Sequence, residues 1–188
     1  MPAFRPSAVA EPKWTNLDKL RGAMLPASVA PWLRDEGSLT RALVNACHGR
    51  LRVDLQRQGW GGALTSERRL LGMAQAQTAL LREVKLLCDE QPWVFARTLI
   101  PASSLRGRAR RLAHLRSRPL GAVLFADPAT RRLAVQVARL SARHALYQSA
   151  CSHLADKPPL LWGRRTLFAY AGRPILVNEI FLPAVPER

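Results

Sequence analysis

Alternation of apolar and polar residues with a period of two is the feature that most restricts how this chain can fold. Leu51, Val53 and Leu55 alternate with polar neighbours, as the side chains of a half-buried strand do. Four further segments have the composition of strands: 79–88, 93–100, 133–140 and 165–182. Hairpins rather than a strand–helix repeat join them, so we predict an α+β domain with one antiparallel sheet of about six strands and helices on one side.

Turns and helices complete the expected domain. Residues 89–92 form a short polar turn, and Gly172-Arg173 is typical of a two-residue hairpin turn. Helical spacing relates Val29, Trp32 and Leu33, Ser38 is a candidate N-cap for a helix carrying Leu39, Leu43 and Cys47, and residues 103–115 suit a third helix. Residues 1–13 contain three prolines and no periodicity. We therefore expect a mobile tail over 1–13 and a single domain over 14–188.

The composition suits a folded domain with an unusual charge. Of 188 residues 48% are hydrophobic, which is enough to form a core without a metal or a disulfide. The formal net charge is +16, which predicts salt-sensitive association with nucleic acid or acidic membranes but identifies neither as the partner.

The cysteines and the apolar runs indicate in which cellular compartment the protein is expected. Cys47, Cys88 and Cys151 are odd in number and widely spaced, so we expect no disulfide framework. No apolar run approaches the length of a membrane span. A reduced, cytoplasmic protein is the resulting expectation. Two Cys/His pairs, Cys47-His48 and Cys151 with His153, lie too far apart in the chain to predict a metal site or an activated nucleophile.

Two charged residues fall on apolar strand faces. Arg82 shares a face with Leu80 and Val84, and Glu179 shares one with Val177 and Phe181. An unpaired buried charge costs several kcal/mol. Either the two form an interior ion pair, or a bulge returns one of them to solvent, or they line a pocket in the sheet. In a pocket, Arg82 would bind the carboxylate of a small organic acid, because a guanidinium matches a carboxylate bidentately.

Four sequence blocks in order also resemble the chorismate pyruvate-lyase family, over residues 31–183. They are Leu81-Arg82-Glu83-Val84 with Leu86-Leu87-Cys88; Gln91-Pro92-Trp93 with Ala96-Arg97-Thr98 and Pro101; Pro119-Leu120-Gly121 with Leu124-Phe125; and Trp162-Gly163-Arg164-Arg165 with Gly172, Pro174, Leu176, Glu179 and Phe181-Leu182-Pro183.

The resemblance implies a fold, a reaction and a site. The fold is a six-stranded antiparallel sheet flanked by helices, with helical flaps closing an internal ligand cavity. The reaction converts chorismate to 4-hydroxybenzoate and pyruvate, the entry to ubiquinone biosynthesis, without a metal or cofactor. By the resemblance, Arg82 binds the ligand carboxylate, Glu179 meets the ring hydroxyl and is the candidate catalytic residue, and backbone groups of Leu39 and Leu120 complete the pocket. Residues 141–161 depart from the family pattern as a longer link.

Two other functions stay open. The ligand-binding domains of some transcription regulators share this architecture, so the chain could be a sensor of small aromatic acids. Alternatively, a basic run could line a phosphate backbone: Arg106, Arg108, Arg110, Arg111, Arg116 and Arg118. That run lacks interleaved aromatics for base stacking. We therefore expect a solvated face and no specific nucleic-acid partner. The sequence has no long heptad repeat or extended apolar stripe, so we expect a monomer.

Overall fold

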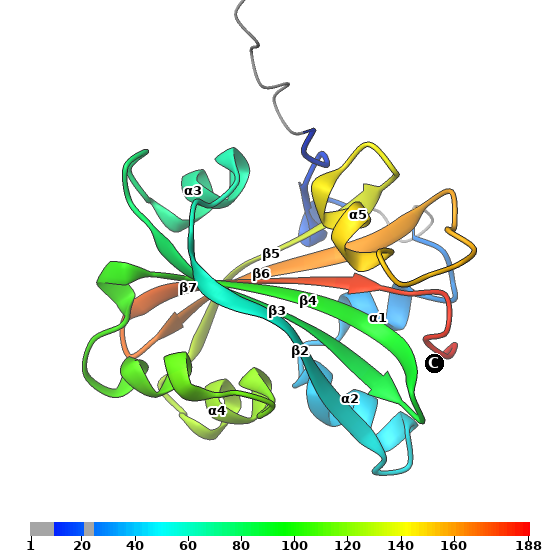
Figure 1. Ribbon diagram of the computed structural model, residues 1–188. Coiled ribbons are helices and arrows are strands. Elements are labelled where there is room, and N and C mark those ends of the chain that lie inside the picture. Colours follow the sequence, from blue (N-terminus) through cyan, green and yellow to red (C-terminus); the bar gives the residue numbers. More distant parts are fainter. Residues whose placement is uncertain (1–9, 21–24) are drawn as a thin grey trace, which may run out of the picture.

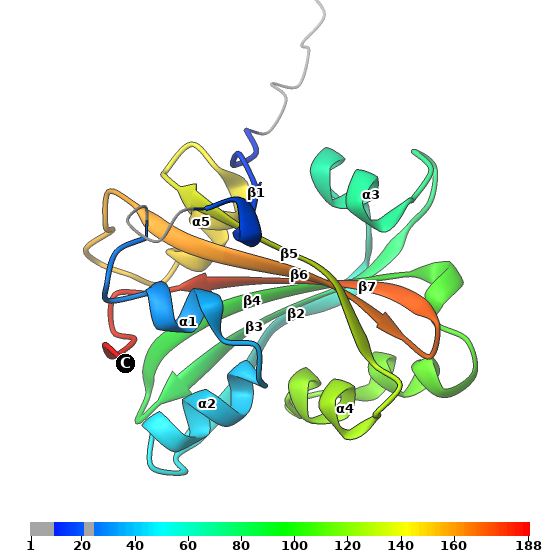
Figure 2. The same cartoon turned by 180° about the vertical axis from the view of Figure 1, so that it is seen from behind.

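The protein is built on one antiparallel sheet of seven strands in the order β1-β5-β6-β7-β4-β3-β2 (Figures 1 and 2). A computed structural model describes residues 10–20 and 25–188. The strands are β1 Thr15–Asn16, β2 Leu51–Gly61, β3 Ala79–Cys88, β4 Gln91–Pro101, β5 Arg131–Leu140, β6 Leu161–Tyr170 and β7 Arg173–Phe181. The predicted α+β class is confirmed, and the seventh strand is the two-residue edge strand β1.

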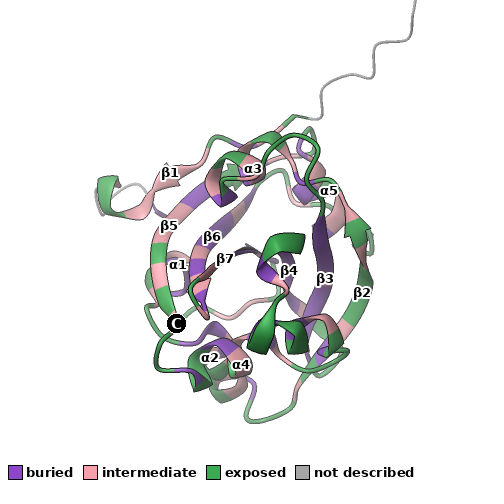
Figure 3. Ribbon diagram, turned by 90° about the vertical axis from the view of Figure 1, so that its left-hand side faces the viewer, coloured by how far each residue is buried: buried purple, intermediate pink, exposed green. Residues whose placement is uncertain are grey.

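Helices cover both faces of the sheet, so the prediction of helices on one side is wrong. α1 (Ala30–Arg34), α2 (Leu39–Ala46) and α4 (Leu120–Ala126) lie on one face, and α3 (Thr65–Leu71) and α5 (Ala145–Ala150) lie on the other (Figure 1). The central strands are accordingly buried on both sides, as Figure 3 shows for β3 and β4. A strand buried on both faces gives a continuous apolar run instead of alternation.

Strand β2 continues beyond the alternating residues Leu51, Val53 and Leu55, as far as Gly61. Its register against β3 shifts between Leu55 and Arg57, which is the effect of a β-bulge. Beyond the shift this edge strand is largely exposed, with Trp60 58% accessible. The alternation therefore stops at the bulge while the pairing with β3 continues.

Two tight hairpins set the register of the central strands. Tyr170 pairs with Arg173, so the turn residues are Ala171 and Gly172, with φ angles of 49° and 72°. Positive φ at both positions is typical of a type I′ turn. The predicted turn at Gly172-Arg173 is therefore wrong by one residue, because the glycine occupies the second turn position. Asp89 and Glu90 form the equivalent β3–β4 turn.

The helical predictions are confirmed in part. Ser38 is the N-cap of α2, with its Oγ accepting from the backbone N–H of Arg41 at 3.4 Å. The single helix predicted over 103–115 is wrong. Two 3₁₀ segments, η3 (Ala102–Ser104) and η4 (Gly107–His114), replace it, and η4 begins at Gly107, whose φ is 54°. A short 3₁₀ segment, η1 (Leu17–Lys19), follows β1.

Cys47 and Cys88 form a disulfide, with their Cα atoms 5.7 Å apart. The expectation of reduced cysteines is wrong for this pair, and Cys151 is free and buried. The two residues are 41 positions apart, and pairing of β2 with β3 places Leu51 opposite Cys88. Strand register thus brings the end of α2 to the end of β3, and a cysteine count contains no such information.

The described start of the chain and the longer link lie on the sheet face opposite α2 and α4. Most of the tail predicted over 1–13 falls outside the described residues, but Ala10 bridges to His144 and the Glu11 carboxylate accepts from the Ser66 N–H at 3.0 Å. Within 141–161, α5 packs beneath the opposite face against Phe95 and Ile180. No helix among residues 10–20 and 25–188 has the length and hydropathy needed to cross a bilayer.

Candidate active site

Strand register places Arg82 and Glu179 on the same face of the sheet, with β4 between their strands. Arg82 lies opposite Thr98, and Ala96 lies opposite Glu179. Two inter-strand spacings and two residues of strand rise separate the two Cα atoms by about 12 Å. The small side chains of Ala96 and Thr98 form the floor between them. The face can therefore hold a small molecule between a cation and a carboxylate.

Arg82 is 2% exposed and has no carboxylate partner within the described chain. Its Nη2 donates to the backbone carbonyls of Arg116 at 2.8 Å and Arg118 at 3.0 Å. Its Nε is buried and, among the described residues, has no acceptor. Burial lowers the pKa of the guanidinium. The predicted alternative of an interior Arg82–Glu179 ion pair is wrong, and Arg82 retains donors for an anionic ligand.

Glu179 pairs instead with Arg164, its direct cross-strand neighbour on β6. Arg164 Nε donates to Glu179 Oε2 at 2.8 Å, and the Glu179 side chain is 14% exposed. Arg164 Nη1 also donates to the carbonyls of Trp32 at 3.0 Å and Asp35 at 2.8 Å. These bonds hold the carboxylate in place and leave Oε1 without a hydrogen bond from the described chain.

A pocket joins these groups between the sheet and the helices α2 and α4. It has a volume of about 50 Å³. All four residues singled out from the sequence line it: Leu39, Arg82, Leu120 and Glu179. The twelve others are Thr40, Val53, Val84, Leu86, Ala96, Thr98, Pro119, Gly121, Leu124, Phe125, Phe168 and Val177. The walls are mainly apolar, with a cation and a carboxylate as the charged groups, a lining that suits a small organic acid.

Leu39 and Leu120 are the first residues of α2 and α4. Backbone N–H groups in the first turn of a helix have no intrahelical acceptor and can bind a ligand. The two helix ends approach closely at Gly121, where an added Cβ would lie 2.8 Å from Thr40 Oγ1. A side chain at position 121 would therefore force the Thr40 side chain to move. Closure of the pocket by flaps remains a prediction.

Sequence reasoning missed several residues of this site. Arg164 occupies the same sheet face as Thr166 and Phe168, and the parity argument applied to β6 would have found it. Phe125 was unforeseeable by parity, because it comes from a helix whose position only the tertiary packing sets.

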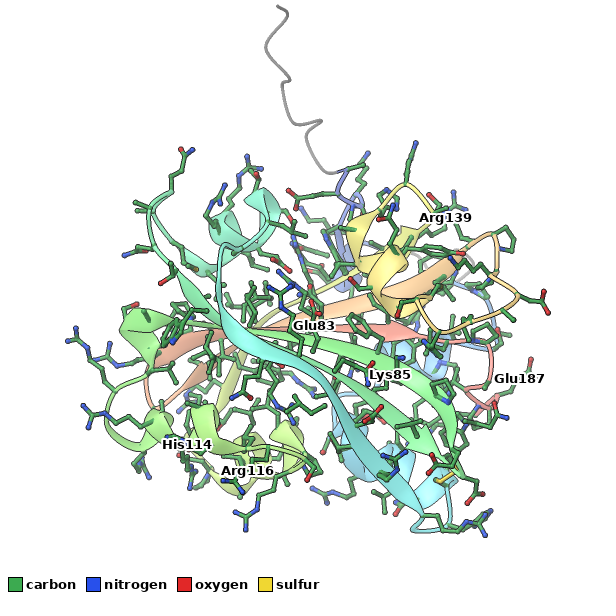
Figure 4. The ribbon with its side chains drawn as sticks, viewed as in Figure 1. Glu83, Lys85, His114, Arg116, Arg139 and Glu187 are labelled. Carbon is green, nitrogen blue, oxygen red and sulfur yellow. A yellow bond between two sulfur atoms is a disulfide. The ribbon has the colours of Figure 1, made fainter. Side chains whose placement is uncertain are left out.

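The remaining sequence candidates lie elsewhere. Cys47 belongs to the disulfide, and the described residues contain no cluster of three or more His, Cys, Asp or Glu side chains suited to a metal ion. The arginines of the basic run are exposed. Figure 4 shows one of them, Arg116, in the segment beside α4. The run thus lies on the outer surface of the layer that covers the pocket.

Together, the fold and the site define a single-sheet α+β domain with a partly enclosed pocket for a small acid. Residues 8–188 match the family model described as chorismate lyase. The chain is 43% identical over 188 residues to the probable chorismate pyruvate-lyase of Azoarcus sp. strain BH72, covering 98% of this chain and 94% of the relative. It is 43% identical over 154 residues to the protein of that name from Methylococcus capsulatus strain Bath, covering 82% and 94% respectively. The chain belongs to the chorismate lyase family.

Solved structures agree on the fold. A GntR-family transcriptional regulator from Bacillus cereus superposes with a TM-score of 0.54 at 12% identity, covering 74% of this chain and 96% of that one. The ligand-binding domain of a putative GntR-family regulator from Bordetella bronchiseptica gives a TM-score of 0.53 at 14% identity, covering 74% and 89%. At these identities the likeness concerns the architecture alone.

Proposed function

We propose that this protein is a chorismate pyruvate-lyase that converts chorismate to 4-hydroxybenzoate and pyruvate. The observation that carries the proposal is a buried arginine without a carboxylate partner, Arg82, in the same pocket as Glu179 in a chain of this family. Arg82 binds the ring carboxylate, and Glu179 accepts a hydrogen bond from the ring hydroxyl. Backbone groups of Leu39 and Leu120 complete the contacts.

The reaction requires the protein mainly to position the substrate. The ether C–O bond to the ring breaks, and the neighbouring ring carbon loses a hydrogen. The electron pair of that C–H bond makes the ring aromatic, and the hydrogen reaches the enol methylene, which becomes the methyl group of pyruvate. The hydrogen moves directly in a cyclic transition state or with help from Glu179. In both routes the apolar walls orient the substrate and exclude water.

Mixing the purified protein with chorismate tests the proposal. We expect equal, protein-dependent release of pyruvate and 4-hydroxybenzoate without added metal or nucleotide. Release of neither product would overturn the proposed reaction. If 4-hydroxybenzoate nevertheless binds, the alternative of a sensor domain on the same fold takes its place.

Glu179→Gln removes the charge and preserves the size of the side chain. We expect kcat/KM for chorismate to fall on the order of 10- to 100-fold, because the amide is a weaker acceptor for the ring hydroxyl and no longer neutralises Arg164. Steady-state kinetics and calorimetric titration with 4-hydroxybenzoate measure the effect. Glu187→Gln, at an exposed position, is the matched control. Unchanged kinetics and affinity in Glu179→Gln would reduce its role to the ion pair with Arg164.

The proposal includes a cytoplasmic monomer whose partners are chorismate and 4-hydroxybenzoate, with no specific nucleic acid. It requires no metal or redox cofactor, because aromatisation of the ring drives the reaction.

A further inference from the structure

Two arginines of the described chain have a buried Nε without a hydrogen-bond acceptor, and the proposed function gives a ligand to only one of them. Among the described residues, Arg82 and Arg132 are the arginines with a buried Nε that lacks a hydrogen-bond acceptor. A guanidinium can offer Nε and one Nη to the two oxygens of a carboxylate. Arg82 is assigned to the ring carboxylate of chorismate, whereas Arg132 has no assigned ligand.

Arg132 contacts two aromatic side chains of the pocket lining and itself lines the neighbouring pocket beside Asp35 and Glu36. It projects from β5, and its guanidinium carbon is 5.2 Å from the ring centre of Phe125 and 5.7 Å from that of Phe168. Both rings line the pocket. Its Nη1 donates to the carbonyl of Glu36, and its Nη2 donates to the carbonyl of Gly37 at 2.5 Å. The two Nη atoms of Arg132 thus donate to the loop before α2. Its Nε has no acceptor among the described residues.

The guanidinium also lies near the Glu179 end of the pocket. Arg164, the partner of Glu179, donates to the carbonyl of Asp35, and Arg132 donates to the next carbonyl along the chain, that of Glu36. Burial and the nearby positive charge of Arg164 lower the pKa of Arg132, while Glu179, Asp35 and Glu36 act in the opposite direction. The two arginines therefore converge on one short loop.

Among the charged residues around this loop, Arg132 has no carboxylate partner within the described chain. Glu179 is paired with Arg164, and the Asp35 carboxylate is paired with Arg188. Glu36 is exposed to solvent and forms no ion pair within the described chain. Arg82 inside the pocket and Arg132 behind two of its aromatic side chains are thus two cations without a carboxylate partner in the described chain. Chorismate is a dianion whose two carboxylates lie on the ring and on the enolpyruvyl group.

We propose that Arg132 binds the enolpyruvyl carboxylate of chorismate. This inference rests on the proposed function and adds a residue that distinguishes substrate from product. Pyruvate carries the second carboxylate away, and 4-hydroxybenzoate retains only the one that Arg82 binds. Arg132 therefore strengthens binding of the substrate and contributes little to binding of the aromatic product.

The test compares Arg132→Met and Arg132→Lys with Arg131→Met, which changes an exposed neighbour on the same strand. Methionine keeps an apolar stem against the two rings and removes the charge. We expect Arg132→Met to raise KM for chorismate on the order of 30-fold while changing the Kd of 4-hydroxybenzoate less than about 3-fold. Arg132→Lys restores part of the lost affinity, and Arg131→Met matches the wild type.

The outcomes separate this inference from its alternatives. Because Arg132 also holds the loop at Glu36 and Gly37, a purely structural role would weaken chorismate and 4-hydroxybenzoate binding equally, and that result overturns the inference. An unchanged KM in Arg132→Met overturns it as well. If Arg132→Met fails to fold, Arg132→Lys must show a raised KM with an unchanged Kd for 4-hydroxybenzoate. A wild-type protein that releases no product refutes the proposed function itself.

Discussion

Arg82→Met will lower kcat/KM for chorismate by at least about 100-fold, because it removes the buried cation that pairs with the ring carboxylate. Truncating one partner of a buried, hydrogen-bonded charge pair costs about 2–5 kcal/mol, which at the upper end exceeds a thousandfold in affinity. Steady-state release of 4-hydroxybenzoate measures kcat/KM, and calorimetry measures the affinity for the product.

The same substitution leaves the free protein folded. In the absence of ligand Arg82 is a desolvated charge without a carboxylate partner, and replacing such a charge with an apolar side chain is often neutral or stabilising. The carbonyls of Arg116 and Arg118 lose a donor, so we expect a change in Tm of only a few degrees. Arg57→Met, an exposed arginine on β2, is the control. Wild-type turnover by Arg82→Met would refute the site assignment.

Glu67→Ala will lower the free energy of unfolding by about 3–5 kcal/mol. Glu67 is a residue of α3 and is 1% exposed. Its Oε1 accepts from Arg97 Nε at 3.2 Å and Asn178 Nδ2 at 3.0 Å, and its Oε2 accepts from the Leu64 N–H at 2.9 Å. Alanine leaves the buried donors of Arg97 and Asn178 without these acceptors and removes one of two carboxylates that neutralise Arg97. The other, on Glu83, lies 2.6 Å from Arg97 Nη1.

Urea denaturation followed by circular dichroism measures this loss as a lower midpoint. Arg69→Ala changes an exposed residue of the same helix and should alter stability by no more than about 0.5 kcal/mol. Because Glu67 lies on the sheet face opposite the pocket, folded Glu67→Ala should retain most of its affinity for 4-hydroxybenzoate. A decrease in the free energy of unfolding of less than about 1 kcal/mol would contradict the proposed contribution of the Glu67 hydrogen bonds to stability.

Part of the site could be predicted because it depends only on local geometry. Side chains alternate between sheet faces whatever the neighbouring strands are, so Arg82 and Glu179 were recognisable as charges on apolar faces. Their partners were not recognisable in this way. The Glu179–Arg164 pair depends on the Ala171-Gly172 turn, which sets the register of β6 against β7.

The sequence by itself determined the strands, the antiparallel hairpins, the cap of α2 and the two charges that an apolar face cannot leave unmatched. Only the tertiary structure decided that helices cover both faces, that Cys47 meets Cys88, and that Arg132 on β5 contacts two aromatic rings of the pocket lining. Periodicity and turn chemistry act over a few residues and are written into the chain. Contacts between distant segments depend on strand order and register, which many sequences of the same local pattern could arrange differently.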